Sequence, residues 1–181
     1  MKKVCLCICL GAFLLSCNGD DDKEKTESTT PATSAETKPV VDLPYTASYS
    51  SSFNTDISDA DLKMVLMSYK DWSDGNMSGL SKAMADSVSV DMSSGEHFSG
   101  TNADLMKRWS TYRDSLSSVR IDMAAWQKMY ATDKKEAYIV TWYDEWDTYK
   151  NGKVDSATYH DINQIKDGKI TWYSQYKRLK K

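Results

Sequence analysis

Three turn signals in the C-terminal part of the chain constrain its fold more than any other feature. Asn151-Gly152 and Asp167-Gly168 each lie between segments in which apolar and polar residues alternate, and Asp133-Lys134 precedes them in a similar setting. Asn-Gly and Asp-Gly favour two-residue hairpins, because both central residues of a type I′ turn need a positive φ. The pattern therefore predicts four consecutive antiparallel strands, over residues 119–130, 136–149, 154–166 and 169–178.

Ahead of these strands the apolar residues recur with a helical period. Ser58-Asp-Ala-Asp61 is typical of a helix start with Ser58 as the N-cap, and an apolar stripe from Leu62 to Trp72 ends at Asp74-Gly75-Asn76. We expect a second short helix at 78–85, a strand at 87–92, a loop at 93–100 and a third helix opening at 101–104. Three helices followed by a meander predict an α+β domain, with the helices packed on one face of the sheet.

The turns also predict which residues share a face of the sheet, because a two-residue turn fixes the register. They place Trp142 opposite both Ala125 and Asp161, and they place Asn163 opposite Trp172. One face is then mostly apolar and is expected to meet the helices, but it carries polar exceptions. Since a buried carboxylate without partners is costly, each such group is expected to be paired, neutral or facing a water-filled hollow.

An apolar concavity with a few convergent polar groups predicts a ligand pocket. The residues expected to form it are Tyr69, Trp109, Trp142, Asp144, Trp146, Tyr159, Asp161, Asn163, Trp172 and Tyr176. Asp144 and Asp161 are expected within reach of each other across a hairpin, where close carboxylates raise one pKa and suit acid/base catalysis. Three interpretations stay open: ligand binding, catalysis by Asp161 or Asp144, and a structural module that fills its own pocket.

Composition narrows the function classes. Residues 45–181 contain 18 Lys and Arg against 19 Asp and Glu, so there is no basic footprint for nucleic acid. The only histidines are His97 and His160, expected in a loop and on the outer face of the sheet, and the four cysteines all lie within the first 17 residues. We therefore expect no metal site, and the absence of a Gly-rich phosphate loop predicts no nucleotide cofactor.

The N-terminus is typical of a secretory signal peptide, with Lys2 and Lys3 before a short apolar run. The run ends in Leu14-Leu15-Ser16-Cys17, which resembles the lipobox of bacterial lipoproteins. The resemblance implies that residues 1–16 are removed and that Cys17 is acylated, which would hold the protein at a membrane of the cell envelope.

Residues 17–44 follow as an acidic, Ser/Thr-rich tether that cannot bury enough apolar surface to fold, and residues 45–181 form one domain. The acidic triplet 20–22 resembles a surface-export signal of Bacteroidetes-type lipoproteins. The outer membrane is the expected site of anchoring. Surface display and a periplasmic location both stay open.

The order of elements over residues 56–178, with Gly100-Thr101 before the third helix and Asp167-Gly168-Lys169-Ile170 in the last hairpin, resembles the nuclear transport factor 2 (NTF2)-like superfamily. The SnoaL-like (polyketide cyclase-like) branch is the closer match. The resemblance implies a curved sheet wrapped around helices, a cone-shaped pocket and often a homodimer through the outer sheet face.

Members of the superfamily include isomerases, dehydratases, cyclases and proteins that only bind. In the isomerases a hydroxyl donor would fall near Tyr69, an acidic partner at Asp161 and the general base at Met92, or at Asp91 after a one-residue slip. We expect non-catalytic binding of a small apolar or amphipathic ligand or of a partner protein. The alternative is an isomerase, lyase or hydrolase with an Asp acid/base.

Overall fold

A curved sheet organises the domain. The computed structural model describes residues 42–180, so the predicted signal peptide, Cys17 and most of the predicted tether lie outside the described residues. The four long strands are β4 (Leu116–Ala131), β5 (Glu136–Tyr149), β6 (Val154–Lys166) and β7 (Lys169–Leu179). Each pairs antiparallel with the next, which confirms the predicted meander.

Three shorter strands complete the sheet of the described residues, whose order is β1-β4-β5-β6-β7-β2-β3. β1 (Phe53–Asn54) pairs with the end of β4, and β2 (Met84–Asp91) pairs with both β7 and β3 (His97–Thr101). The β2–β7 pairing is parallel, which the turn signals do not predict. Residues 97–101 form a strand where the sequence predicts only a loop.

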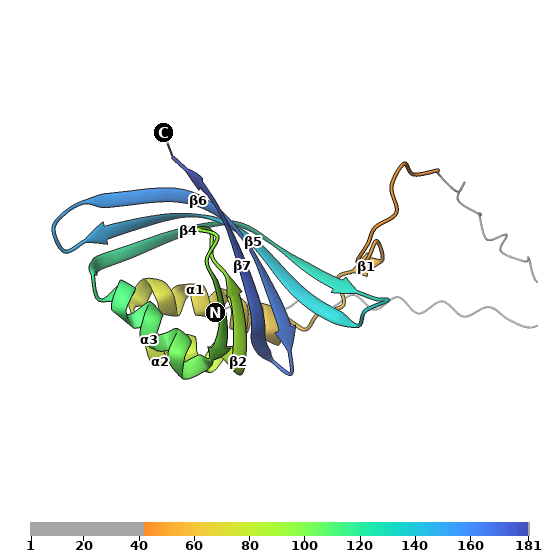
Figure 1. Ribbon diagram of the computed structural model, residues 1–181, viewed down its shortest axis with the longest axis horizontal. Helices are drawn as coiled ribbons and strands as arrows, with labels where there is room; N and C mark the ends of the chain where they lie inside the picture. The colour runs from red at the N-terminus through yellow and green to blue at the C-terminus, as the bar shows by residue number, and fades with distance from the viewer. Residues whose placement is uncertain (1–41, 181) are drawn as a thin grey trace, which may run out of the picture. The chain divides into compact units, whose positions relative to one another are not determined.

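The three helices of the described residues cover one face of this sheet (Figure 1). They are α1 (Asp59–Asp74), α2 (Met77–Ala83) and α3 (Asn102–Arg113). The Ser58 Oγ accepts a hydrogen bond from the Asp61 N–H at 3.0 Å, and Gly75 ends α1 with a φ of 73°. Both ends of α1 are therefore as predicted, and the α+β fold class is confirmed.

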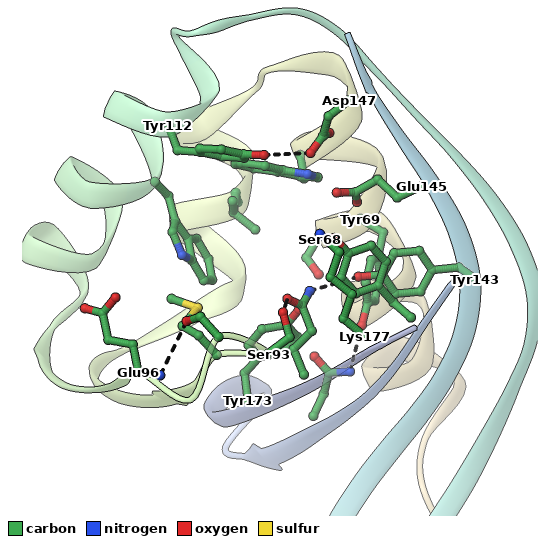
Figure 2. Close-up of a pocket in the computed structure, with 18 of the residues that line it drawn as sticks. Ser68, Tyr69, Ser93, Glu96, Tyr112, Tyr143, Glu145, Asp147, Tyr173 and Lys177 are labelled. Carbon is green, nitrogen blue, oxygen red and sulfur yellow. Dashed lines mark hydrogen bonds between the residues drawn. The ribbon is translucent and has the colours of Figure 1, made fainter. Parts of the chain in front are cut away.

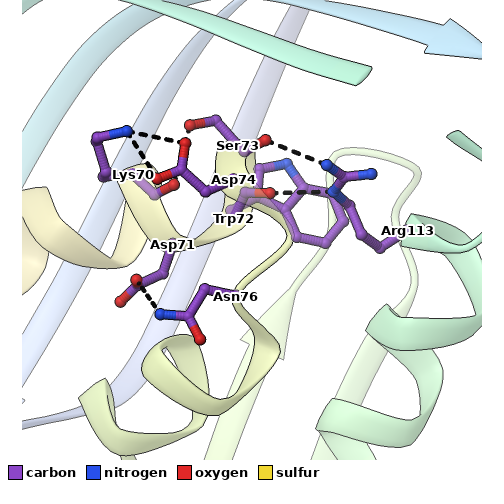
Figure 3. A network of polar contacts seen from close by, with 7 residues as sticks. All are labelled: Lys70, Asp71, Trp72, Ser73, Asp74, Asn76 and Arg113. Carbon is purple, nitrogen blue, oxygen red and sulfur yellow. Dashed lines mark hydrogen bonds and ion pairs between the residues drawn. The ribbon is translucent and has the colours of Figure 1, made fainter. Parts of the chain in front are cut away.

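A polar network joins the end of α1 to α3 (Figure 3). The Arg113 guanidinium donates to the carbonyl oxygens of Trp72 and Ser73, both at 3.1 Å. These carbonyls belong to the last turn of a helix, which leaves its acceptors without helical partners and favours a cation. The contact holds the two helices together where the Trp72 and Tyr112 rings stack, with centroids 6.1 Å apart.

The core lies between the helices and the sheet. Five of its side chains are completely buried: Val65 of α1, Val90 of β2, Leu105 of α3, Ile139 of β5 and Ile170 of β7. Burying such a side chain contributes about 1.5–3 kcal/mol relative to leaving it in water. Among the described residues, no helix combines the length and the apolar character needed to cross a membrane.

The register differs from the prediction at one hairpin. Lys166 pairs with Lys169 across a turn in which Asp167 and Gly168 both have positive φ, as predicted. At the preceding hairpin, however, the Tyr149 N–H donates to the Lys153 carbonyl oxygen at 2.8 Å. The loop therefore holds residues 150–152, one residue more than the two-residue turn expected there.

That extra loop residue exchanges the two faces of β5 relative to the prediction. Thr141 pairs with Asp161 and Trp142 pairs with His160, whereas the prediction paired Trp142 with Asp161. Because side chains alternate between faces, a one-residue shift moves every side chain of a strand to the other face. The face of β5 toward the helices consequently carries Thr141, Tyr143, Glu145 and Asp147, all of them buried.

Two bulges alter the register further. In β7, Ile170 pairs with Ile165 as predicted, but Trp172 pairs with Gln164, so Thr171 is an extra residue. In β4, Ala125 pairs with Trp142 as predicted, whereas Met123 pairs with Tyr143 and Ala124 is unopposed. A bulge moves all later residues of its strand to the opposite face.

Candidate ligand-binding cavity

A cavity of about 420 Å³ lies between the helices and the inner face of the sheet. Seven of its lining residues are aromatic, and Leu80, Met84 and Met92 add apolar side chains toward α2 and β2. The residues that line it are Ser68, Tyr69, Trp72, Leu80, Met84, Met92, Ser93, Ser94, Glu96, Trp109, Tyr112, Tyr143, Glu145, Asp147, Tyr159, Asn163, Tyr173, Gln175 and Lys177. Figure 2 shows Tyr112 approaching from α3, with Glu145 and Asp147 on the opposing strand.

Five of the residues predicted for the pocket lie at this cavity. Tyr69, Trp109, Tyr159 and Asn163 line it. Asp161 lies directly behind the wall, where its carboxylate contacts the hydroxyl of Tyr69 at 3.0 Å. Helix α1 and strand β6 thus bring together residues that are far apart in the sequence, as the family resemblance implies.

The other five predicted residues lie away from the cavity, and their placement in the pocket was wrong. Trp142, Asp144 and Trp146 are on the outer face of β5 because of the three-residue loop. Trp172 and Tyr176 are on the outer face of β7 because of the bulge at Thr171. The pairing of Asp144 with Asp161 as neighbouring carboxylates is therefore wrong as well, since the two lie on opposite faces of the sheet.

Asp144 has ordinary surface partners. Its carboxylate accepts a hydrogen bond from the Thr158 hydroxyl at 2.8 Å and forms an ion pair with Lys180 at 2.5 Å. These contacts, with Lys180 first, lower the pKa of Asp144. A carboxylate held in its ionised form on an outer face is unsuited to acid/base work inside the cavity.

Asp161 is surrounded by tyrosines. Its Oδ2 accepts hydrogen bonds from the hydroxyls of Tyr69, Tyr143 and Tyr173 at 3.0, 2.7 and 2.9 Å. The side chain has no exposure to solvent, and its Oδ1 has no hydrogen-bond partner. Burial raises the pKa of Asp161 to about 7, against the opposing effect of the three hydroxyls.

Two side-chain amides orient those tyrosines. Gln175 Nε2 donates to the hydroxyl oxygens of Tyr173 and Tyr143, at 2.7 and 3.3 Å. Asn163 Nδ2 donates to the hydroxyl oxygen of Tyr69 at 3.1 Å. A tyrosine oxygen that already accepts a hydrogen bond directs its own proton elsewhere, so these contacts turn the hydroxyl protons toward Asp161. The network closes this end of the cavity with hydrogen-bonded polar groups, apart from the unpartnered Oδ1 of Asp161.

The other end of the cavity carries two acids that sequence reasoning missed. Glu145 and Asp147 are buried neighbours on the inner face of β5. Burial, followed by the charges of Asp147 and Asp161, raises the pKa of Glu145 to about 8. Burial also raises the pKa of Asp147, although the Tyr112 hydroxyl and Lys177 oppose the shift. The alternation Thr-x-Tyr-x-Glu-x-Asp over 141–147 was the available signal, and the inverted face assignment concealed it.

The base position implied by the isomerases also falls at the cavity. Met92 lines the wall, whereas Asp91 accepts hydrogen bonds from the Trp172 indole at 2.8 Å and contacts His97 at 2.7 Å. Asp91 is therefore engaged outside the cavity, and its pKa is lowered, first by His97. Within residues 42–180, no group of three or more His, Cys, Asp or Glu side chains is arranged to hold a metal ion.

Solved structures similar to this chain share its fold. An LEH-like epoxide hydrolase of Mycobacterium tuberculosis aligns with a TM-score of 0.56 and 8% identity, covering 66% of this chain and 83% of the hydrolase. A putative polyketide cyclase of Xanthomonas campestris aligns with a TM-score of 0.52 and 17% identity, and the alignment covers 65% of this chain and 89% of the cyclase. An NTF2-like protein of unknown function from Mesorhizobium loti aligns with a TM-score of 0.52 and 12% identity, and the alignment covers 68% of this chain and 94% of that protein.

These similarities show that the chain has the NTF2-like fold that its sequence resembles. No protein-family model and no curated protein matched the sequence. At such low identity the likeness extends to the fold alone.

Proposed function

We propose that this protein binds a small amphipathic ligand in the aromatic cavity without transforming it. The observation that carries the proposal is the cavity itself, whose volume of about 420 Å³ lies in the range typical of small-molecule sites. Its aromatic wall supplies apolar contact, and its few polar groups can orient a ligand. An accessible cavity of this size also argues against a module that fills its own pocket.

The position of Asp161 argues against catalysis as the main role. A general acid or base must come within hydrogen-bonding reach of the substrate proton. Here Asp161 is completely buried, and three tyrosine hydroxyls occupy the carboxylate oxygen that points toward the cavity side. A carboxylate enclosed in this way stabilises the wall and fixes the tyrosines.

A second candidate function, isomerase, lyase or hydrolase chemistry, is favoured by the hydrogen bond from the Tyr69 hydroxyl, which lines the cavity, to Asp161. Burial raises the pKa of Asp161 to about 7, so a substrate proton could reach it through Tyr69. The names of two similar structures, a hydrolase and a putative polyketide cyclase, fit this alternative. Asp144, the other predicted acid/base, has no part in it.

We further propose that acylated Cys17 anchors the domain at the cell envelope. The support is the resemblance of Leu14-Leu15-Ser16-Cys17 to a lipobox and the acidic, Ser/Thr-rich segment that follows. A lipid anchor would hold the cavity near a membrane, where amphipathic molecules concentrate. Association with a partner protein or a second copy through the outer sheet face remains part of the same proposal.

Native mass spectrometry of the full chain from its own cell envelope tests ligand binding. We expect a non-covalent adduct that is lost on denaturation and absent from Met92→Trp, which places a larger ring in the cavity. Trp142→Phe on the outer face is the matched control and should keep the adduct. The proposal is wrong if no adduct is found, or if Met92→Trp retains it. The masses also show whether the protein is a monomer or a dimer.

A further inference from the structure

Asp147 lines the cavity, and one of its carboxylate oxygens has no hydrogen-bond partner. The Tyr112 hydroxyl donates to Asp147 Oδ2 at 2.8 Å (Figure 2), whereas Oδ1 is buried and has no hydrogen-bond partner. Only 6% of the residue is exposed. A buried carboxylate oxygen without a donor costs free energy, so such a group is either a local defect or one half of a contact that a ligand completes.

Glu145 lies two residues away on the same face of the strand, and it is also buried and lines the cavity. The charged groups facing this pair are Asp155 and Asp161 from β6, Lys177 from β7 and Arg113 from α3. Lys177 is exposed, and Arg113 is occupied by carbonyl oxygens of α1. The end of the cavity at Glu145 and Asp147 therefore has more negative than positive groups, and neither of the two cations facing the pair among the described residues is fully buried.

The aromatic wall beside these acids is suited to a cation. Trp72 and Tyr112 stack with an interplanar angle of 3°, and Trp109 meets Trp72 edge to face. Ammonium groups are attracted to the faces of Trp and Tyr rings, more strongly when water is excluded. The protein already uses part of this wall in that way, since the Lys177 ammonium lies 5.5 Å from the centroid of the Tyr159 ring.

Resting on the binding function proposed above, we infer that the ligand carries an organic ammonium group, held by the Asp147 and Glu145 carboxylates against the aromatic wall. The apolar remainder of the ligand would extend toward Met84 and Met92. The raised pKa of Glu145 supports this inference, because a bound cation would restore the ionised form that burial disfavours. Binding should therefore release protons near neutral pH.

Two isosteric probes test the inference on the full chain in a detergent with a neutral sugar headgroup. Choline and 3,3-dimethyl-1-butanol have nearly the same shape, but only choline is charged. We expect calorimetry to show choline binding at least about tenfold more tightly than the alcohol. We also expect choline binding to release protons, detected as a dependence of the measured heat on the buffer.

Substitutions identify the acids. The double variant Glu145→Gln with Asp147→Asn should bring the preference for choline close to onefold and abolish the proton release. Asp144→Asn makes the same chemical change on the same strand but on the outer face, so it should leave both unchanged. Choline binding no tighter than the alcohol would overturn the inference, and so would an unchanged preference in the double variant.

The two proposals fail in different ways. If neither probe binds at about 10 mM while native mass spectrometry still shows an adduct that Met92→Trp removes, the ammonium inference is wrong and ligand binding stands. If no adduct is found and neither probe binds, both are wrong. A preference for choline that the double variant abolishes supports both.

Discussion

Replacing Asp161 should change how the stability of the protein depends on pH. The carboxyl group is completely buried, and its pKa is raised from 3.8 to about 7. Between these two values the folded protein holds a proton that the unfolded chain releases. The free energy of unfolding must therefore fall as pH rises through this window, and it must become flat above the folded pKa.

The magnitude follows from the width of the window. Each pH unit is worth about 1.4 kcal/mol for one proton, so the two units from pH 5 to pH 7 give about 3 kcal/mol from Asp161 alone. Asp161→Asn removes this term, and its carboxamide oxygen can still accept from the tyrosines. We expect the loss of stability between pH 5 and pH 8 to be about 3 kcal/mol smaller in this variant than in the wild type.

Urea unfolding followed by tryptophan fluorescence, at several pH values from 5 to 8, measures this difference. Asp144→Asn is the control, because the pKa of Asp144 is lowered and its titration ends below this range. It should shift the stability equally at every pH. Glu145, whose pKa is raised to about 8, contributes a slope of the same sign. Asp144→Asn keeps this slope, whereas Asp161→Asn reduces it by the part of the Glu145 shift that the Asp161 charge causes, a smaller cause than burial. An Asp161→Asn curve parallel to the wild-type curve would refute the reasoning about the buried carboxyl.

Three further outcomes can be measured. Tyr143→Phe removes a hydrogen-bond donor to the ionised Asp161, so it should raise the pKa of Asp161 further. The free energy of unfolding should fall by about 1–2 kcal/mol at pH 8 but by less at pH 5. An equal loss of stability at the two pH values would contradict this. Deleting Lys150 should leave the β5–β6 register unchanged, because Asn151-Gly152 then forms the two-residue turn. The free energy of unfolding should stay within about 1 kcal/mol of the wild-type value. Cross-strand contacts measured by NMR that show a different β5–β6 register would contradict this. Cys17→Ser should move the protein from the membrane to the soluble fraction with loss of the acyl mass; continued membrane association would exclude the anchor.

Local chemistry made much of the fold predictable. The Ser58 cap, the Gly75 stop and the Asp167-Gly168 turn each depend on a few neighbouring residues, and all three are confirmed. The meander followed from these turns. By contrast, the parallel β2–β7 pairing joins segments that are distant in the sequence, and nothing local to either strand specifies it.

The site was predictable where the strand register was. On β6 the inward residues Tyr159, Asp161 and Asn163 were assigned to the face that meets the helices, and they lie there. On β5 a loop one residue longer than expected reversed the assignment. Asn-Gly occurs in both two-residue and three-residue hairpins, the latter placing Gly in the left-handed region, as Gly152 does with a φ of 85°. Composition alone does not distinguish these loops.

The error on β5 also has a physical cause in its tryptophans. An assignment that places the most aromatic residues inside selects Trp142 and Trp146. The Trp146 ring is nevertheless covered on the outer face, where Arg120 Cζ and Lys180 Nζ lie 3.6 and 4.2 Å from the ring centroid. Cations can thus shield a tryptophan outside the core. The inward face carries Glu145 and Asp147 instead, at a desolvation cost that a strand selected only for packing would avoid. That cost is the strongest physical reason to seek a ligand at this end of the cavity.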